Sequence, residues 1–328
     1  MNKNWKTFLL SQQNSVSDET KIAFAEAANS GENSIYPLTQ FAILSVMGKD
    51  AAKLLQGQIT CNINDINEAK SSLAAMCNPK GRVIATFLLV KTADAFLLIL
   101  PVELLETVKK RLQMYVLRSD VKITDVTDER CLLGISEPEK PDHAFLTEIQ
   151  KDIISVNFSG STRRKLLIAD TDNAIHFWSE QVDSQGFRVG SSDEWRYLDI
   201  VSGIPWVTKA TSEEFIPQML NLDKLGGISF NKGCYTGQEI VARTHYLGKS
   251  KREMFLAECQ TSALPEPNSS IVNRGSEEQE VAGKVLLAQL DQQGCKMLVI
   301  LQVAEPTYDN LGLQDDTQAQ LKLLPFNT

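Results

Sequence analysis

The sequence predicts an α+β fold followed by a small, separate all-β domain. Three observations support this. Strand-like apolar runs follow one another through short turns, and the few helical segments are amphipathic. After Gly248 only short strand candidates remain, separated by turn-rich segments such as 264–268 and 291–294. Because neighbouring strands look like hairpins, we expect an α+β arrangement rather than a doubly wound parallel sheet.

The elements expected in the first 248 residues alternate between strands and helices. Strands are predicted over 41–46 (ending at Gly48), 73–77, 82–91, 95–100, 121–126, 131–135 and 166–169. Helices are predicted over 18–30, 50–58, 102–117 and 172–182. In the C-terminal part, strands are predicted over 254–258, 280–288, 297–303 and 320–324. Asn78-Pro79-Lys80-Gly81 fits a type I turn joining two of the strands. We therefore expect domains over 1–248 and 249–328.

Composition narrows the class of protein. The chain has 328 residues, 43% hydrophobic and 23% charged, which is typical of a globular protein with two or three domains. A net charge of −8 disfavours extensive contact with nucleic acid. The six cysteines are dispersed without a C-x-x-C pair, which predicts reduced thiols and a cytoplasmic location. No apolar run approaches the roughly 20 residues that span a bilayer, so no membrane segment is expected.

Several common catalytic signatures are missing from the sequence. There is no phosphate-binding G-x-x-x-x-G-K-[ST] loop, no G-x-G-x-x-G after a strand and no G-x-S-x-G elbow. The three histidines, His143, His176 and His245, are far apart and lack metal-ligand spacing. We therefore predict no metal site.

The segment 231–243 is the most informative part of the chain. Thr236 and Glu239 match a T-x-x-E capping box, which predicts a helix starting just after Thr236. Glu239 and Arg243 have the spacing of an ion pair on that helix. Its inward stripe is expected to comprise Ile240, Val241, Thr244 and Leu247.

Cys234 would then lie two residues before the cap of this helix. The helix dipole and Lys232 would both favour its thiolate, and Gly233 and Gly237 would keep its surroundings open. Such a thiol would be nucleophilic, easily oxidised and a good ligand for soft metals. The alternative is a small core residue beside a well-capped helix, since buried inert cysteines are common.

A second helix is predicted after Ser191, where Ser191 and Glu194 form another capping box and Gly203 and Pro205 end the helix. Trp195 projects away from its apolar stripe of Tyr197, Ile200, Val201 and Ile204. That tryptophan must meet a second domain, a flat aromatic ligand or water.

A basic cluster follows the first of these segments. It comprises Arg243, His245, Lys249, Lys251 and Arg252. This cluster is either a solvated linker surface or a binding site for an anionic tail or for RNA.

Residues 232–239, Lys-Gly-Cys-Tyr-Thr-Gly-Gln-Glu, resemble the K-G-C-Y-x-G-Q-E signature of YgfZ-type proteins. These are folate-binding relatives of the glycine-cleavage T-protein that are associated with tRNA modification. The resemblance continues through Trp195 and through segments 48–58, 78–82, 203–205, 215–218 and 226–230, and so covers most of the chain.

The resemblance implies a two-lobed α+β folate-binding region, with lobes that are not continuous halves of the chain, followed by a small antiparallel β-barrel. It implies that a tetrahydrofolate-type cofactor binds in a central cleft, with Trp195 and Phe41 as its aromatic contacts. It assigns the redox or cluster-related role to Cys234, supported by Lys232, Gly233, Tyr235, Gly237, Gln238, Glu239 and Arg243. The implied partners are iron–sulfur enzymes, including those that modify tRNA, and we expect effects on tRNA to pass through such an enzyme.

One departure separates this chain from the T-protein. T-proteins carry an Asp-Asp pair after their hairpin turn, one carboxylate of which assists methylene transfer, whereas this chain has Ala85-Thr86. A T-protein-like, tetrahydrofolate-dependent aminomethyltransferase is therefore the alternative function, and an accessory protein is the leading one.

Overall fold

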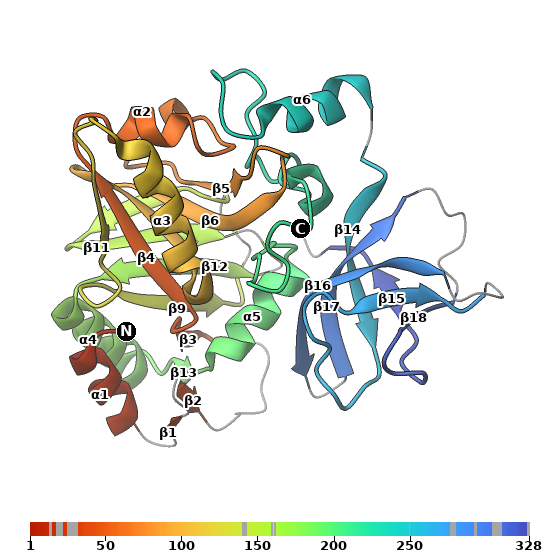
Figure 1. The fold of residues 1–328 in the computed structure, drawn as a ribbon. Coiled ribbons are helices and arrows are strands. Elements are labelled where there is room, and N and C mark those ends of the chain that lie inside the picture. Colours follow the sequence, from red (N-terminus) through yellow and green to blue (C-terminus); the bar gives the residue numbers. More distant parts are fainter. Residues whose placement is uncertain are drawn as a thin grey trace.

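The structure is a computed structural model. The residues described are 1–12, 15–17, 22–24, 32–139, 143–158, 160, 162–248, 250–275, 280–291, 294–303 and 310–326. They form two packed sheets with helices on their outer sides, and a third, curled sheet made by the C-terminal part (Figure 1). The predicted α+β class is confirmed.

The first sheet is antiparallel and follows the hairpins expected from the sequence. Its strands in spatial order are β5 (Ser72–Cys77), β6 (Val83–Lys91), β7 (Ala95–Pro101), β4 (Phe41–Met47) and β8 (Lys122–Asp125). The turn between β5 and β6 is the predicted one: Gly81 N–H donates to Asn78 O at 2.9 Å, and Gly81 has a φ of +70°. A type I turn followed by a left-handed residue is a common three-residue hairpin loop.

The second sheet begins before the first one in the chain and resumes after it. Its order is β10 (Thr147–Gln150), β11 (Ile153–Phe158), β12 (Arg163–Ala169), β9 (Cys131–Glu137), β3 (Ser34–Pro37) and β13 (Arg188–Val189). Because β3 pairs with β9, the chain crosses between the sheets twice. The two sheets are therefore not continuous halves of the sequence.

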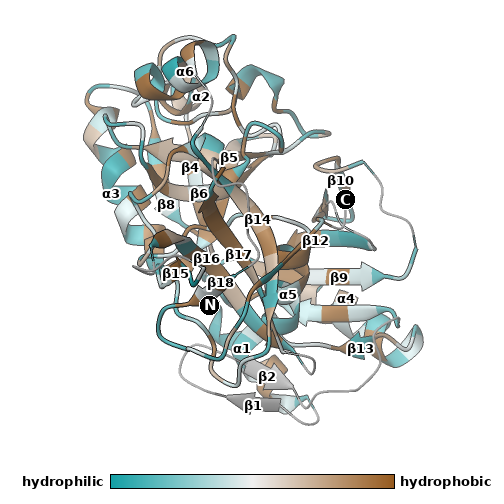
Figure 2. Cartoon of the chain, turned by 90° about the vertical axis from the view of Figure 1, so that its right-hand side faces the viewer, coloured by the Kyte–Doolittle hydropathy of each residue, from teal (hydrophilic) through white to brown (hydrophobic). Residues whose placement is uncertain are grey.

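Successive side chains along the strands of the second sheet point alternately into two different hydrophobic cores. Leu166 and Ile168 of β12 face the core shared with the first sheet, while Leu167 and Ala169 face a core on the other side. That second core is covered by α1 (Lys3–Ser11) and α4 (Thr171–Ser179), whose Trp5 and Trp178 rings meet edge to face at 5.6 Å. Figure 2 shows the hydrophobic colouring concentrated on the inner strands.

Further helical segments connect these strands, and one of them, a π-helical turn, continues α4. They are α2 (Ala51–Gln56), η1 (Ile63–Asp65), η2 (Val102–Leu104), α3 (Leu105–Val116), the π-helical turn η3 (Glu180–Ser184) and η4 (Pro217–Leu220). Val108 and Leu112 of α3 are fully buried, as the predicted amphipathic pattern requires.

Two helices carry the segments singled out by sequence. Helix α5 (Ser192–Val201) begins with the predicted capping box: Glu194 N–H donates to Ser191 Oγ at 3.2 Å, and Ser191 N–H donates to Glu194 Oε1 at 3.1 Å. It packs against β3 on one side and against β16 and β17 on the other. Helix α6 (Gln238–Leu247) follows the Cys234 segment.

The C-terminal part forms a curled antiparallel sheet. Its order is β18 (Leu311–Leu313), β15 (Ser270–Asn273), β16 (Val281–Asp291), β17 (Gly294–Gln302), β14 (Arg252–Cys259) and β19 (Lys322–Leu324). Leu321 N–H donates to Leu311 O at 2.8 Å, so the segment leading into β19 also pairs with β18 and draws the two edges together. The domain boundary predicted at 248/249 falls between α6 and β14, and residue 249 lies outside the described residues.

One predicted element is wrong. The alanine-rich stretch 18–30 was expected to be a helix, but β2 (Ile22–Phe24) pairs antiparallel with β1 (Ser15–Ser17). The rest of that stretch lies outside the described residues. Helix propensity is a weak prior that pairing with another segment overrides. Among the described residues, no helix has both the length and the apolar character needed to cross a membrane.

Candidate functional site

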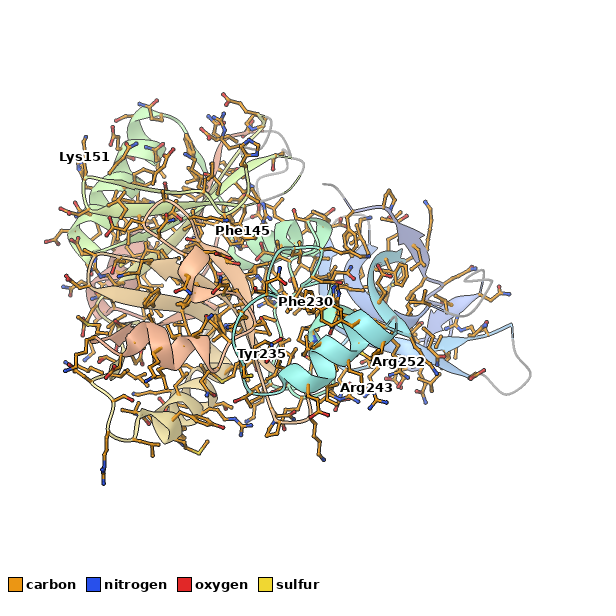
Figure 3. The ribbon with its side chains drawn as sticks, turned by 90° about the horizontal axis from the view of Figure 1, so that it is seen from above. Phe145, Lys151, Phe230, Tyr235, Arg243 and Arg252 are labelled. Carbon is orange, nitrogen blue, oxygen red and sulfur yellow. The ribbon has the colours of Figure 1, made fainter. Side chains whose placement is uncertain are left out.

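The signature loop, residues 232–239, is braced by the loop that follows α2. Lys232 Nζ donates to Ile59 O at 2.8 Å and to Cys61 O at 2.7 Å. Thr236 N–H donates to Gly57 O at 3.1 Å. Residues far apart in the chain thus fix both ends of the loop, and Figure 3 shows Tyr235 close to the start of α6.

Gly237 fixes the loop against the hairpin turn of the first sheet. It has a φ of +84°, and a Cβ placed there would lie 2.5 Å from Asn78 O. Gly81 is equally constrained from the other side, where a Cβ would lie 2.8 Å from Ile240 Cβ. The signature loop and the 78–81 turn therefore touch backbone to backbone, which only glycine allows.

The predicted capping box at Thr236 is wrong. Helix α6 begins at Gln238 with Gly237 as its N-cap, and no side chain caps it. The Thr236 hydroxyl instead donates to Gln58 Oε1 at 3.3 Å. Cys234 consequently lies three residues before the cap rather than two.

Cys234 is the exposed cysteine of the chain, since all six cysteines lie in described parts of the structure and the other five are buried. Burial raises the pKa of Cys61 and of Cys77 to about 12 each, and that of Cys131 to about 11. Those thiols stay protonated and shielded from solvent. The core interpretation of Cys234 is therefore excluded.

Lys232 supports the loop rather than the thiol. Its ammonium group is directed at two carbonyls and lies 5.0 Å from the centre of the Tyr235 ring. Burial lowers the pKa of Lys232 to about 8. The expectation that its charge serves Cys234 is replaced by a role in fastening the loop.

Tyr235 anchors the middle of the loop. Its ring is 7% exposed, and its hydroxyl is buried without a hydrogen-bond partner among the described groups. Burial raises the pKa of that phenol above its usual range.

The outer face of α6 is exposed to solvent. Only Val241 of the expected stripe is buried, and Leu247 is 82% exposed. Gln218 Nε2 holds the helix by donating to Val241 O at 2.6 Å. Glu239 and Arg243 are both exposed, and no ion pair between them is found in the described structure. Figure 3 shows Arg243 on α6.

The predicted basic cluster is only partly described, because Lys249 lies outside the described residues. Arg243, His245 and Lys251 are exposed. The His245 ring stacks on Phe230 with centroids 3.7 Å apart.

Trp195 lies in the core instead of lining a cleft. Its exposure is 0%, and its ring centre lies 5.6 Å from that of Tyr36 and 6.0 Å from that of Phe158. Arg164 lies over the ring at 5.0 Å, and a Cβ on Gly134 would overlap it at 2.4 Å. Helix α5 is sandwiched between two sheets, so the face that looks polar in sequence is buried as well.

Phe41, the second predicted folate contact, is 4% exposed and packs on Trp206 with centroids 4.7 Å apart. Sequence analysis missed Trp206, although it directly follows the Gly203-Ile204-Pro205 match. Trp206 Nε1 donates to Asp199 Oδ2 at 2.8 Å, which joins Phe41 to the helix of Trp195.

Asp199 also accepts from Arg164 Nη1 at 2.8 Å, and both side chains are 1% exposed. Burial raises the pKa of Asp199, opposed by the charge of Arg164 and the hydrogen bond from Trp206. This fully paired carboxylate is committed to holding α5 against β12.

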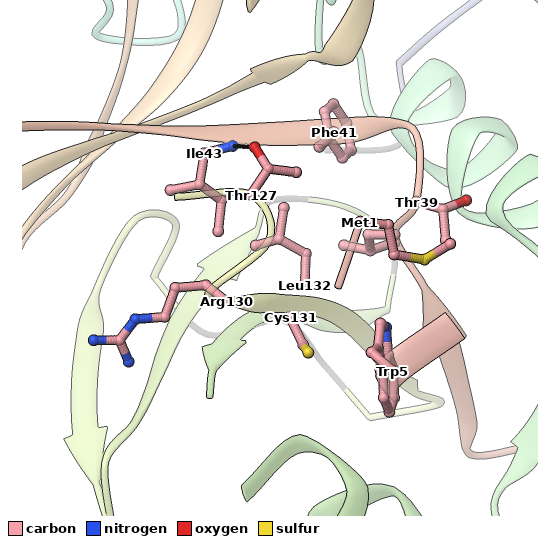
Figure 4. Close-up of a pocket in the computed structure, with 10 residues that line it drawn as sticks. Met1, Trp5, Thr39, Phe41, Ile43, Thr127, Arg130, Cys131 and Leu132 are labelled. Carbon is pink, nitrogen blue, oxygen red and sulfur yellow. Dashed lines mark hydrogen bonds between the residues drawn. The ribbon is translucent and has the colours of Figure 1, made fainter. Parts of the chain in front are cut away.

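The space beside these rings does not fit a folate in this conformation. A cavity of about 20 Å³ lies next to Phe41, lined also by Trp5, Leu38 and Cys131 (Figure 4). That volume holds roughly one water molecule, whereas a site for a cofactor of this size needs ~300 Å³ or more. A wider surface hollow of about 700 Å³ is lined by Asp50, Lys53, Leu117, Arg118 and Ser119, none of which belongs to the predicted folate contacts.

Two polar groups near the rings nevertheless lack partners. Trp195 Nε1 and both amide atoms of Gln40 are buried without hydrogen bonds in the described structure. Their segments adjoin, because Thr39 Oγ1 lies 3.1 Å from Ser192 Oγ. Orphaned groups of this kind are costly unless something else satisfies them.

Ala85 and Thr86, the residues that the sequence resemblance sets against the paired carboxylates of the T-protein, lie on β6. Both are buried, and Thr86 Oγ1 donates to Pro205 O at 2.7 Å and accepts from Val207 N–H at 2.9 Å. No ionisable group is available at this point. Within the described residues, no group of three or more His, Cys, Asp or Glu side chains is arranged to hold a metal ion.

Comparison with known proteins identifies the class to which this fold belongs. Residues 21–169 match the model of the GCVT N-terminal domain. The structure resembles the glycine cleavage system aminomethyltransferase T from Bartonella henselae, with a TM-score of 0.73 at 12% identity, over 90% of this chain and 86% of that one. The fold is thus that of the T-protein class.

Two curated relatives are more specific, and both are named tRNA-modifying protein YgfZ. The one from Colwellia psychrerythraea is 32% identical over 82% of this chain and 86% of its own length. The one from Hamiltonella defensa is 33% identical over 78% of this chain and 79% of its own length. The chain belongs to the YgfZ family.

The contact between the signature loop and the hairpin turn makes a direct prediction. Gly237→Ala should lower the free energy of unfolding by more than about 1 kcal/mol, because its Cβ meets a backbone oxygen at a positive φ. Gly233→Ala is the matched control: its Cβ meets nothing within 4 Å, so stability should stay level or rise by up to about 1 kcal/mol. Urea unfolding measures both. Equal effects of the two substitutions would contradict the packing described.

Proposed function

We propose that this chain supports iron–sulfur enzymes of tRNA modification through the thiol of Cys234. The observation that carries the proposal is the contrast between one exposed cysteine on a braced loop and five buried ones. The relatives' printed name, tRNA-modifying protein, supports the process in which the chain acts.

The setting of Cys234 suits a reacting group. Lys232 and Gly237 hold the loop at either side, while a Cβ at Gly233 would meet nothing within 4 Å. A partner can therefore approach the sulfur without unfolding any part of the core. Group transfer, reversible oxidation and transient ligation of a cluster all require this access.

Replacing the thiol tests the proposal. Cys234→Ala should abolish rescue of tRNA methylthiolation in cells that lack the protein, because the reacting atom is lost while an exposed site tolerates alanine. Asn231→Ala, which changes an exposed residue just before the signature loop, should rescue normally. The readout is the methylthiolated nucleoside in digested tRNA, measured by mass spectrometry at equal protein levels. Full rescue by Cys234→Ala would refute the role of the thiol.

We further propose that a tetrahydrofolate binds where the segments of Phe41 and Trp195 adjoin. The T-protein-like fold, the aromatic rings and the unpartnered Trp195 Nε1 support this. Because both rings are covered, binding requires the surrounding side chains to move apart. No chemical step is assigned to the folate.

Equilibrium dialysis with tetrahydrofolate tests this part. Trp195→Leu should weaken binding by about three- to tenfold, the loss expected for one aromatic contact. Trp178→Leu removes an equally buried indole from the other core, away from the cavity beside Phe41, and should bind as the wild type does. Absence of binding by the wild-type chain, or equal binding by both variants, would dismiss this folate site without touching the role of Cys234.

The alternative function, a T-protein-like aminomethyltransferase, needs a carboxylic acid that this chain lacks at Ala85-Thr86. Thr86 is locked to residues 205 and 207 and Ala85 has no polar group, so nothing there assists methylene transfer. A lesser alternative is that the chain contacts tRNA directly, through the exposed cationic side chains on α6 and just after it. The net charge of −8 favours an effect through a modifying enzyme.

A further inference from the structure

Two cysteines face each other across neighbouring strands of the C-terminal sheet. Cys259 ends β14 and Cys295 is the second residue of β17, and the register pairs them directly. The two strands lie side by side in Figure 1. Both side chains belong to the apolar core inside the curled sheet and are 4% and 2% exposed.

Their geometry suits a covalent bond. Directly opposed residues of an antiparallel pair have Cα atoms about 4.5 or 5.5 Å apart. Both separations fall in the range of roughly 4.4–6.8 Å that a disulfide spans. Both cysteines are free thiols, so their sulfurs are available to form such a bond.

The two thiols are unequal. The neighbouring Cys295 side chain lowers the pKa of Cys259, whereas the neighbouring Cys259 side chain and burial raise the pKa of Cys295. Cys259 is therefore the thiol that ionises first. One thiolate beside a second thiol is the arrangement in which the first can attack and the second can resolve the product.

The other cysteines lack this arrangement. Cys61, Cys77 and Cys131 are buried, and no described strand register pairs any of them with another cysteine. Among the described residues, the Cys131 thiol has the Thr171 hydroxyl as its hydrogen-bond partner, at 3.8 Å. It therefore serves as a control for a buried but isolated thiol.

We propose that Cys259 and Cys295 are a redox pair that a peroxide converts into a reversible disulfide. The Cys259 thiolate attacks one peroxide oxygen and becomes a sulfenic acid, and the other oxygen leaves and is protonated to water. The Cys295 sulfur then attacks the Cys259 sulfur, the S–O bond breaks and a second water is released. The two thiols lose two electrons in all, hydrogen peroxide gains them, and a dithiol reductant restores the pair.

The position of the two cysteines determines which elements a disulfide between them would join. The pair lies beside the end of β16, where Leu290 is paired with Cys295 and Asp291 interacts with Tyr197 of α5. The disulfide would tie β14 to β17 at the end of the sheet on which α5 packs. This inference stands on the C-terminal sheet alone and does not depend on the role proposed for Cys234.

The test uses the full-length reduced protein, treated with hydrogen peroxide, then denatured and blocked with N-ethylmaleimide. Peptide mass spectrometry should find the Cys259 and Cys295 peptides joined and two hydrogens lighter than their sum, and dithiothreitol should separate them. Cys131→Ser should form the same link. In Cys295→Ser, dimedone should trap a sulfenic acid on Cys259.

The wild-type result decides the matter even if a variant fails to fold. The proposal is overturned if both cysteines still carry N-ethylmaleimide after a treatment that oxidises Cys234. It is equally overturned if the link forms only when urea is present during oxidation.

Discussion

The architecture around Cys234 depends on a backbone-to-backbone contact between the signature loop and the hairpin turn of the first sheet. Gly237 and Gly81 each lie where a side chain would strike the other segment. Because the turn is part of a sheet with almost fully buried strands, it cannot yield easily. The signature loop is therefore held rigidly against the sheet, and Cys234 stays outside the core.

A second constraint fixes the helix between the sheets. Asp199 and Arg164 form an ion pair removed from water, and Trp206 adds a hydrogen bond to the same carboxylate. Such a pair is costly to break, because a lone charge would remain buried. It holds α5 in place, and with it Trp195 and the helix surface against which the C-terminal sheet packs.

Local sequence rules predicted those features whose causes are local. The Ser191–Glu194 box and the Asn78–Gly81 turn need only neighbouring residues, and both form as expected. The Thr236 cap fails because Gln58, distant in sequence, binds its hydroxyl.

The features that sequence reasoning missed all depend on long-range packing. Trp195 is buried because two sheets enclose α5, and Trp206 meets Phe41 only after the chain has crossed between the sheets. The opposed cysteines of β14 and β17 depend on a strand register that no spacing in the sequence reveals.

Alkylation of the native protein tests most directly whether the loop presents its thiol to partners. Under brief exposure to iodoacetamide, mass spectrometry should find Cys234 labelled well before any of the five buried cysteines. A Cys234 that reacts as slowly as the core cysteines would contradict the account.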